Sequence, residues 1–408
     1  MTNHKILIIT SPVWGHSVPA RRLAQNLELI EGNDVSIMTS SKFVDYYSNL
    51  TTLLYDDYIG DQLDIDAIVT KSGIETLHNC LATCLAIRGS ENFKAVDELA
   101  ATFDYIFCDA VLLPLALSFN TSAKIISYQT SIGIPPTIKK DIVLNYATNK
   151  IFPPIVKLAI QDLWFRRRNN KILREFTTKY GVDLSNHQLT HPVADANIIF
   201  TSAYFQPFSH KLTDSYLVGP LLADSEKPVK ISVKRRAYVS LGTMNASDSN
   251  NLRPIVSALL SRQYTVFVKI PEGFSADWIG SPNVISQTFF DQVVELETCS
   301  LFITHAGKNS ADEAILTKTP VICVPQANDQ FLIAARLEEL GLGLISDLNI
   351  KQKSFTKTLD LFEKSRNKFV NNLELAYNEH ITSKTNQVEL DRMIKELGLG
   401  SVTSTKKD

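Results

Sequence analysis

The sequence lacks an excess of charge of either sign, and it lacks any long hydrophobic run. Its 41 lysines and arginines nearly balance its 43 aspartates and glutamates, which leaves a net charge of −2. Electrostatics alone therefore does not favour nucleic acid or an anionic membrane as a partner. No stretch reaches the roughly 18 apolar residues that a membrane helix needs, and the run at residues 6–9 is too short for a secretory signal. We expect a cytoplasmic protein that does not bind nucleic acid.

Cysteine is scarce as well, with only five residues at irregular spacings. An odd number without a regular spacing fits reduced thiols better than a disulfide framework, and reduced thiols are typical of the cytoplasm. Cys80 and Cys84 stand one helical turn apart, and we interpret them as structural thiols rather than metal ligands. The sequence therefore predicts no metal site.

The chain is too long for one hydrophobic core. It has 408 residues, of which 44% are hydrophobic, and single cores stop growing near roughly 250–300 residues. Short apolar runs that alternate with helical periodicity predict an α/β domain with a parallel sheet over residues 1–222. A polar segment at 223–236 is typical of a linker, and the same alternation predicts a second parallel α/β domain over 237–380. A ligand is expected in a cleft between two such domains.

Residues 302–314 are the most informative segment. A strand-like run, Phe302-Ile303-Thr304-His305, breaks at Gly307 and enters a helix. The free N–H groups and the positive dipole end of such a helix form an anion site, and a phosphate fits there. A capped helix beside a buried histidine would give the same pattern, so the segment alone leaves both interpretations open.

This segment, together with residues 325–330, resembles the donor-binding signature of the UDP-glycosyltransferases, including the bacterial macrolide and plant natural-product enzymes. Other likenesses follow in the family's order: the loop at residues 11–19 with its Gly-His-x-x-Pro pattern, Asp109 after a strand, and the segments 200–220 and 238–243. The resemblance runs from residue 6 to about 343. It implies the GT-B architecture, which has two facing Rossmann-like domains, with the acceptor bound by the first and the donor by the second. It also implies that a C-terminal helix at 381–400 packs back on the first domain, ahead of a tail at 401–408 that we expect to be disordered.

The resemblance assigns a role to each matching residue. His16 would be the general base, and Asp109 would hold its other ring nitrogen. In the second domain the diphosphate would be bound by Thr243, His305, Gly307, Asn309 and Ser310, and the ribose by Glu313. The base would be bound by Phe289 and Gln292, and the donor sugar by Asp329 and Gln330. Three positions depart from the family. Ala306 replaces a glycine, which is awkward if the backbone there has a positive φ. Asp291 replaces a proline, and Val18 replaces a frequent asparagine in the first loop.

The implied function is the transfer of a hexose from a UDP-sugar to a hydroxyl of a small, largely apolar acceptor, with inversion. The UDP-sugar is a co-substrate, and neither a cofactor nor a metal is expected. Two alternatives stay open: a UDP-sugar epimerase on the same architecture, and a catalytically silent relative that acts as a binding or activator protein. The basic run at residues 166–168 beside two aromatic residues leaves peripheral membrane contact open too. The sequence predicts neither the acceptor nor the oligomeric state.

Overall fold

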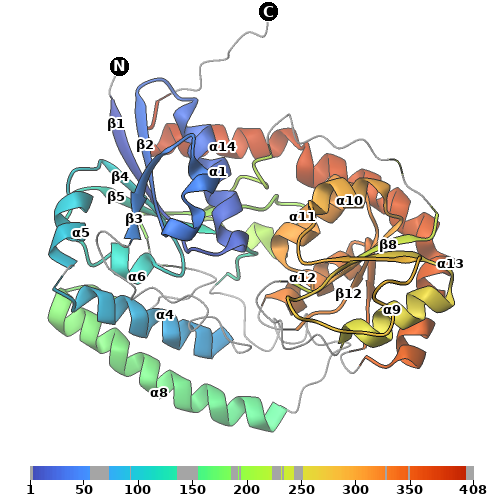
Figure 1. Cartoon of the computed structure of the whole chain (residues 1–408). Coiled ribbons are helices and arrows are strands. Elements are labelled where there is room, and N and C mark those ends of the chain that lie inside the picture. The colour runs from blue at the N-terminus through green and yellow to red at the C-terminus, as the bar shows by residue number, and fades with distance from the viewer. Residues whose placement is uncertain are drawn as a thin grey trace, which may run out of the picture. The chain divides into compact units, whose positions relative to one another are not determined.

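The structure is a computed structural model that divides into two compact units (Figure 1). The first unit comprises residues 1–138, 154–222 and 383–408, and the second comprises 139–153 and 223–382. The residues that the structure describes are 3–55, 73–91, 93–135, 155–184, 192, 194–222, 231, 234–242, 251–326, 329–347 and 350–400. Most of the expected linker and all of the expected tail lie outside these ranges.

The first unit is built on a parallel sheet. In the described residues it has seven strands in the order β3-β2-β1-β4-β5-β6-β7. Its central strands are continuous apolar runs because a parallel sheet is covered on both faces. The strands are β1 (His4–Ile9), β2 (Asn33–Thr39), β3 (Thr51–Leu54), β4 (Tyr105–Asp109), β5 (Lys124–Gln129), β6 (Ala196–Ile199) and β7 (Ser215–Leu217).

Helices cover both faces of this sheet. Ile6 and Ile8 of β1 share a core with α1 and α14, while Leu7 and Ile9 share another core with helices of the opposite layer. The C-terminal helix α14 is therefore part of the first unit. The α-helices of this unit that the structure describes are α1 (Trp14–Glu28), α4 (Gly73–Arg88), α5 (Phe93–Ala100), α6 (Leu113–Ala116), α8 (Ile155–Tyr180) and α14 (Lys384–Leu397).

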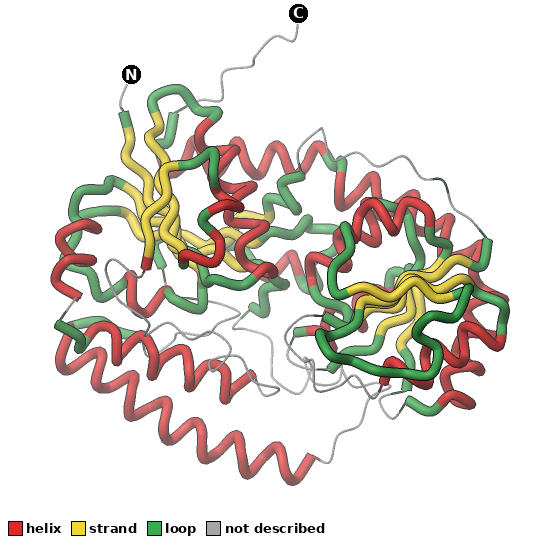
Figure 2. Tube along the Cα trace, in the orientation of Figure 1, coloured by secondary structure: helices red, strands yellow, loops and turns green. Residues whose placement is uncertain are grey.

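The second unit repeats the plan. Its described strands form a six-stranded parallel sheet in the order β10-β9-β8-β11-β12-β13, and the two sheets are drawn in yellow in Figure 2. The strands are β8 (Arg236–Ser240), β9 (Thr265–Lys269), β10 (Val284–Gln287), β11 (Leu301–Thr304), β12 (Val321–Cys323) and β13 (Gly343–Ile345).

One face of the second sheet packs against α9 (Leu252–Ser261) and α13 (Gln352–Ala376). Three further helices of this unit are α10 (Gln292–Thr298), α11 (Lys308–Leu316) and α12 (Gln330–Glu339). Helix α11 contacts both α10 and α12. A π-helical turn, η7 (Tyr377–Ile381), follows α13 and contacts α11. Among the described residues, none of the helices combines the length and the apolar character that a membrane crossing requires.

Strand order in each sheet reverses once, between β1 and β4 in the first unit and between β8 and β11 in the second. In open α/β sheets, ligands bind at the carboxyl ends of the strands where the order reverses. His16 follows β1 and Asp109 ends β4, while Gly242 follows β8 and His305 follows β11. The two parallel α/β units confirm the expected fold class, and their topology brings the key sequence motifs to these two positions.

Candidate active site

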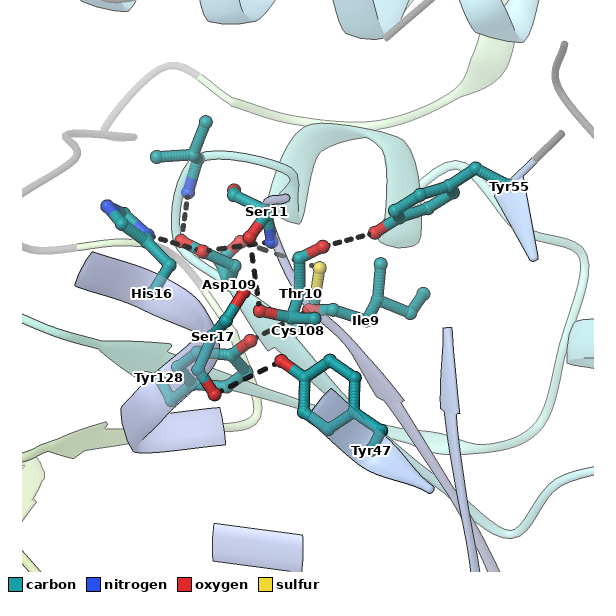
Figure 3. A network of polar contacts seen from close by, with 11 residues as sticks. Ile9, Thr10, Ser11, His16, Ser17, Tyr47, Tyr55, Cys108, Asp109 and Tyr128 are labelled. Atoms are coloured by element: carbon teal, nitrogen blue, oxygen red, sulfur yellow. Dashed lines mark hydrogen bonds and ion pairs between the residues drawn. The ribbon is translucent and has the colours of Figure 1, made fainter. Parts of the chain in front are cut away.

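A histidine and an aspartate pair at the switch point of the first unit. His16 Nδ1 lies 2.5 Å from Asp109 Oδ2 (Figure 3). The Asp109 side chain is almost fully buried, whereas the His16 side chain is 26% exposed. The pair thus consists of an enclosed carboxylate and an imidazole that solvent reaches.

The protein backbone fixes the Asp109 carboxylate. Its Oδ2 also accepts a hydrogen bond from Ser11 N (3.3 Å), and its Oδ1 accepts one from Val111 N (3.1 Å). Burial alone would raise the pKa of Asp109, but the His16 ring and the two N–H donors outweigh it and hold this pKa below its ordinary value. An ionised Asp109 favours the His16 tautomer that donates from Nδ1, and this tautomer carries its lone pair on Nε2.

Helix α1 begins earlier than its sequence suggests. Periodicity and Pro19 predict a helix from residue 19, with His16 in the preceding loop. In the structure the helix begins at Trp14, because the Val13 carbonyl accepts hydrogen bonds from both His16 N (3.0 Å) and Ser17 N (2.9 Å). His16 therefore lies in the first turn of a helix, which limits its orientations more than a loop would.

Three buried tyrosines hold the segment that joins β1 to α1. Tyr128 donates to the Ile9 carbonyl (3.0 Å), Tyr55 to that of Thr10 (2.6 Å) and Tyr47 to that of Ser17 (3.1 Å), as Figure 3 shows. Burial raises the pKa of each phenol, so all three remain donors. Sequence reasoning missed these residues, since no motif links a distant tyrosine to a backbone carbonyl.

In the second unit, His305 fits between two glycines. A Cβ at Gly307 would come within 2.6 Å of His305 Nε2, and one at Gly242 within 3.1 Å. Burial lowers the pKa of His305 to about 4, against an opposing hydrogen bond with the Ser240 backbone. The ring is therefore neutral near pH 7, and its Nδ1 is buried without a hydrogen-bond partner among the described residues.

The backbone between His305 and Gly307 is strained. Ala306 is fully buried and has a φ of 64°, in the left-handed region that glycine prefers. Its N–H donates to the Thr304 hydroxyl (3.1 Å). The substitution of alanine for the family's glycine therefore falls where it is sterically awkward.

Three of the expected donor ligands lie together. The Gln292 amide donates to the Ser310 hydroxyl (3.1 Å) and to the Glu313 carboxylate. Gln292 opens α10, while Ser310 and Glu313 lie on α11. The structure thus joins the residue expected at the base to those expected at the diphosphate and ribose.

Asp291 has a structural role that the sequence did not suggest. It is the N-cap of α10, and its carboxylate accepts a hydrogen bond from Val294 N (3.3 Å). Aspartate is a preferred N-cap because it satisfies an otherwise unpaired N–H of the first turn. An aspartate between a strand and a helix, as Asp291 is, could have indicated this N-cap role. The neighbouring Phe289 is 70% exposed, which leaves its ring face accessible.

The remaining expected ligands lie at the starts of two helices. Gly307 is the N-cap of α11 and Asn309 lies in its first turn. Asp329 is the N-cap residue of α12, and the Gln330 side chain accepts a hydrogen bond from Gln326 N (2.8 Å). Thr243 lies outside the described residues. Within the described part of the chain, no group of three or more His, Cys, Asp or Glu residues is placed to hold a metal ion.

Comparison with known proteins finds a family model and several relatives. The family model described as UDP-glucoronosyl and UDP-glucosyl transferase matches residues 218–373. The uncharacterized UDP-glucosyltransferase YojK of Bacillus subtilis is 26% identical over 173 residues, which are 40% of this chain and 42% of that protein. The NDP-glycosyltransferase YjiC of the same species is 24% identical over 366 residues, 84% of this chain and 85% of that protein. The chain thus spans less than half the length of YojK in its match, and most of the length of YjiC.

A similar fold is found among solved structures. The glycotransferase of kitacinnamycin superposes with a TM-score of 0.74 at 17% identity, over 97% of this chain and 100% of that one. Its identity is low, so this likeness concerns the fold. The fold of the two units is that of the GT-B glycosyltransferases.

Proposed function

We propose that this chain, which belongs to the family-1-like UDP-glycosyltransferases, transfers a hexose from a UDP-sugar to a hydroxyl of a small, largely apolar acceptor. The observation that carries the proposal is the His16–Asp109 pair, with its 2.5 Å contact at the switch point of the first sheet. A solvent-accessible imidazole with a buried carboxylate behind it is suited to general-base catalysis, because the carboxylate orients the ring and stabilises its protonated form.

In this proposal His16 activates the acceptor. With Nδ1–H held by Asp109, the Nε2 lone pair takes the proton of the acceptor hydroxyl as its oxygen attacks the anomeric carbon. The ionised Asp109 then stabilises the imidazolium that forms. The hydrogen bonds from Ser11 and Val111 keep the carboxylate in place for both roles.

The second unit would bind the donor. The first turn of α11 presents N–H groups and a positive dipole end to the diphosphate, with Gly307, Asn309 and Ser310 around it. Thr243, which lies outside the described residues, is expected to bind the diphosphate as well. For this role the neutral His305 ring would carry its proton on Nδ1, which is buried and has no hydrogen-bond partner among the described residues, and would donate a hydrogen bond from it to a phosphate oxygen. Because these groups stabilise the charge of the leaving diphosphate, we propose that transfer needs no metal.

The other donor contacts follow from the same cluster. Glu313 and the Gln292 amide would exchange their mutual hydrogen bond for bonds to the ribose and the base, with the exposed Phe289 ring stacking on the base. Asp329 and Gln330 would bind the sugar hydroxyls. The acceptor oxygen displaces the nucleoside diphosphate in a single step, so the sugar configuration inverts.

We also propose that the protein works in the cytoplasm. Its five cysteines are free and buried, which is typical of proteins in a reducing compartment.

A donor screen tests this proposal. The protein's melting temperature is measured with UDP-glucose, UDP-galactose, UDP-N-acetylglucosamine and dTDP-glucose. The protein is then incubated with each donor and a panel of small phenols and alcohols, and the products are identified by mass spectrometry. We expect one UDP-sugar to stabilise the protein and to yield a glycoside together with free UDP. A new UDP-sugar formed without any acceptor would indicate the epimerase. Binding without any product would indicate the silent relative.

A further inference from the structure

A buried ionic cluster joins α11 to the π-helical turn η7. Lys308 Nζ lies 2.6 Å from both carboxylate oxygens of Asp312, and His380 Nε2 lies 2.7 Å from Asp312 Oδ1. The side chains are 3%, 6% and 0% exposed, so water does not screen these contacts. Sequence motifs did not single out any of the three residues.

The charge states of the cluster follow from its contacts. Burial would raise the pKa of Asp312, but Lys308 and His380 outweigh it and hold this pKa below its ordinary value. Burial lowers the pKa of His380 despite its carboxylate partner, so the ring is neutral and donates its Nε2–H. The cluster therefore pairs one cation with one anion, and the charge of Lys308 is neutralised by Asp312 rather than directed to a ligand.

The cluster holds the end of α11 where the donor diphosphate would bind. Lys308 is the first residue of this helix, and Asp312 follows one turn later. Beyond the other end of α11, Lys318 packs over the Tyr377 ring of η7 at 4.5 Å and pairs with Glu374 at 2.6 Å. The helix is thus tied at both ends to one neighbouring segment, and only the N-terminal tie is buried.

Stability alone does not account for this cluster. The desolvation of buried charges offsets most of their mutual attraction, so well-packed apolar residues stabilise such a site equally well or better. Charge-assisted hydrogen bonds are directional, so they fix the orientation of the groups they join more closely than apolar packing does. The feature whose orientation matters here is the first turn of α11.

We propose that Lys308, Asp312 and His380 are positioning residues for the donor site, which fix the first turn of α11 so that its N–H groups meet the diphosphate in a set orientation. The inference rests on the proposed function of that turn. It assigns the cluster to donor binding: its loss raises the KM for the UDP-sugar and leaves the KM for the acceptor unchanged.

The test measures UDP affinity by isothermal titration calorimetry and both KM values by UDP release. H380L removes the donor to Asp312, whereas H380Q retains an N–H at a similar place. We expect H380L to weaken UDP binding by about tenfold or more, and H380Q to restore most of this loss. F369L is the control, because it loosens the core of α13 away from the cluster and lowers the melting temperature without changing UDP affinity.

A substitution of Asp312 provides a second variant. For this variant, an electrostatic role of the cluster and a positioning role predict opposite changes in UDP affinity. D312N removes the negative charge beside Lys308 near the diphosphate site, so simple attraction between Lys308 and the diphosphate would tighten UDP binding. The positioning role predicts weaker binding instead. Tighter binding by D312N, or equal binding by H380L and the wild type, would overturn the inference while the proposed function stands. Failure of the wild type to bind UDP at all would overturn both.

Discussion

His305 shows how a single residue can make the protein sensitive to pH. Its pKa is lowered by burial to about 4, while an unfolded histidine titrates near ~6.5. Between these values the unfolded chain binds a proton that the folded chain does not, so the free energy of unfolding falls as the pH falls from about 6.5 toward 4. The loss amounts to roughly 3 kcal/mol over this window.

Urea unfolding of the wild type and H305Q at several pH values between 7 and 4.5 measures this contribution. The glutamine variant is expected to show a shallower decline, since it lacks the group that titrates. Parallel curves for the two proteins would mean that His305 is protonated in the folded state as readily as in the unfolded chain.

Ala306 offers a stabilising substitution. A left-handed backbone costs a non-glycine residue about 1–2 kcal/mol, and glycine loses about 0.5–1 kcal/mol more in conformational entropy on folding. A306G is therefore expected to raise the free energy of unfolding by about 0.5–1 kcal/mol. A306V is the opposite test, because a branched side chain at a fully buried position with a φ of 64° should be strongly destabilising. Thermal unfolding of both variants gives the comparison, and a glycine variant less stable than the wild type would show that the strain is absent.

At this scale the sequence predicted identities better than conformations. The resemblance named His16 and Asp109 as partners, and the structure brings them into contact. The resemblance also identified Ala306 as a departure from the family. The sign of the Ala306 φ angle depends on how the chain passes from β11 into α11, so the residue type alone does not predict it. Their catalytic and binding roles remain predictions.

At the scale of the element, Asp291 governs how α10 presents Gln292. Its carboxylate satisfies the Val294 N–H in the first turn of this helix, and Gln292 is the next residue. D291A is expected to cost about 1 kcal/mol of stability and to weaken UDP binding several-fold as the first turn frays. D291S keeps an N-cap acceptor and serves as the matched control in calorimetry. Equal losses in both variants would show that the charge of Asp291, and not its capping bond, is what matters.

The elements that the sequence predicted best are the central strands. β1, β4, β8 and β11 are short apolar runs buried on both faces, and this pattern is visible in the residues. The outer strands β3, β7, β10 and β13 have only three or four residues each and were not predicted. Their residues include polar side chains or a glycine and do not form the buried apolar run that marks a central strand, so no local pattern indicates them and their pairing comes from the neighbouring strand. The same limit applies to the single turn η7.

At the scale of the whole molecule, the last helix completes the core of the first unit. Leu390, Met393, Ile394 and Leu397 of α14 are buried there, and Tyr105 donates to the Leu397 carbonyl at 2.7 Å. Burying four such side chains stabilises by roughly 6–12 kcal/mol, which is comparable to the net stability of a typical domain.

Deletion of residues 383–408 should therefore prevent the first unit from folding, whereas deletion of 401–408 alone should leave the melting temperature unchanged. Circular dichroism and calorimetry of the two truncated proteins test this. A stable, folded product of the longer deletion would contradict the assigned role of α14.

The number and type of the units were predictable from length and from alternating strand and helix patterns. The return of residues 383–408 to the first unit was expected only through the resemblance to the UDP-glycosyltransferases. Nothing in the amphipathic pattern of α14 specifies which of two similar sheets it covers. That choice depends on tertiary contacts such as the hydrogen bond between Tyr216 and Glu396 (2.7 Å).

The most direct test of the account follows the anomeric carbon during turnover. UDP-glucose labelled with ¹³C at C1 is incubated with an acceptor from the panel, and NMR is recorded for the wild type and H16A after calorimetry has shown equal UDP affinity. The account predicts a β-configured glycoside and an equal amount of UDP from the wild type, and a rate about 10²–10⁴-fold lower from H16A. A glycoside formed by H16A at the wild-type rate, or a product with retained α configuration, would contradict it.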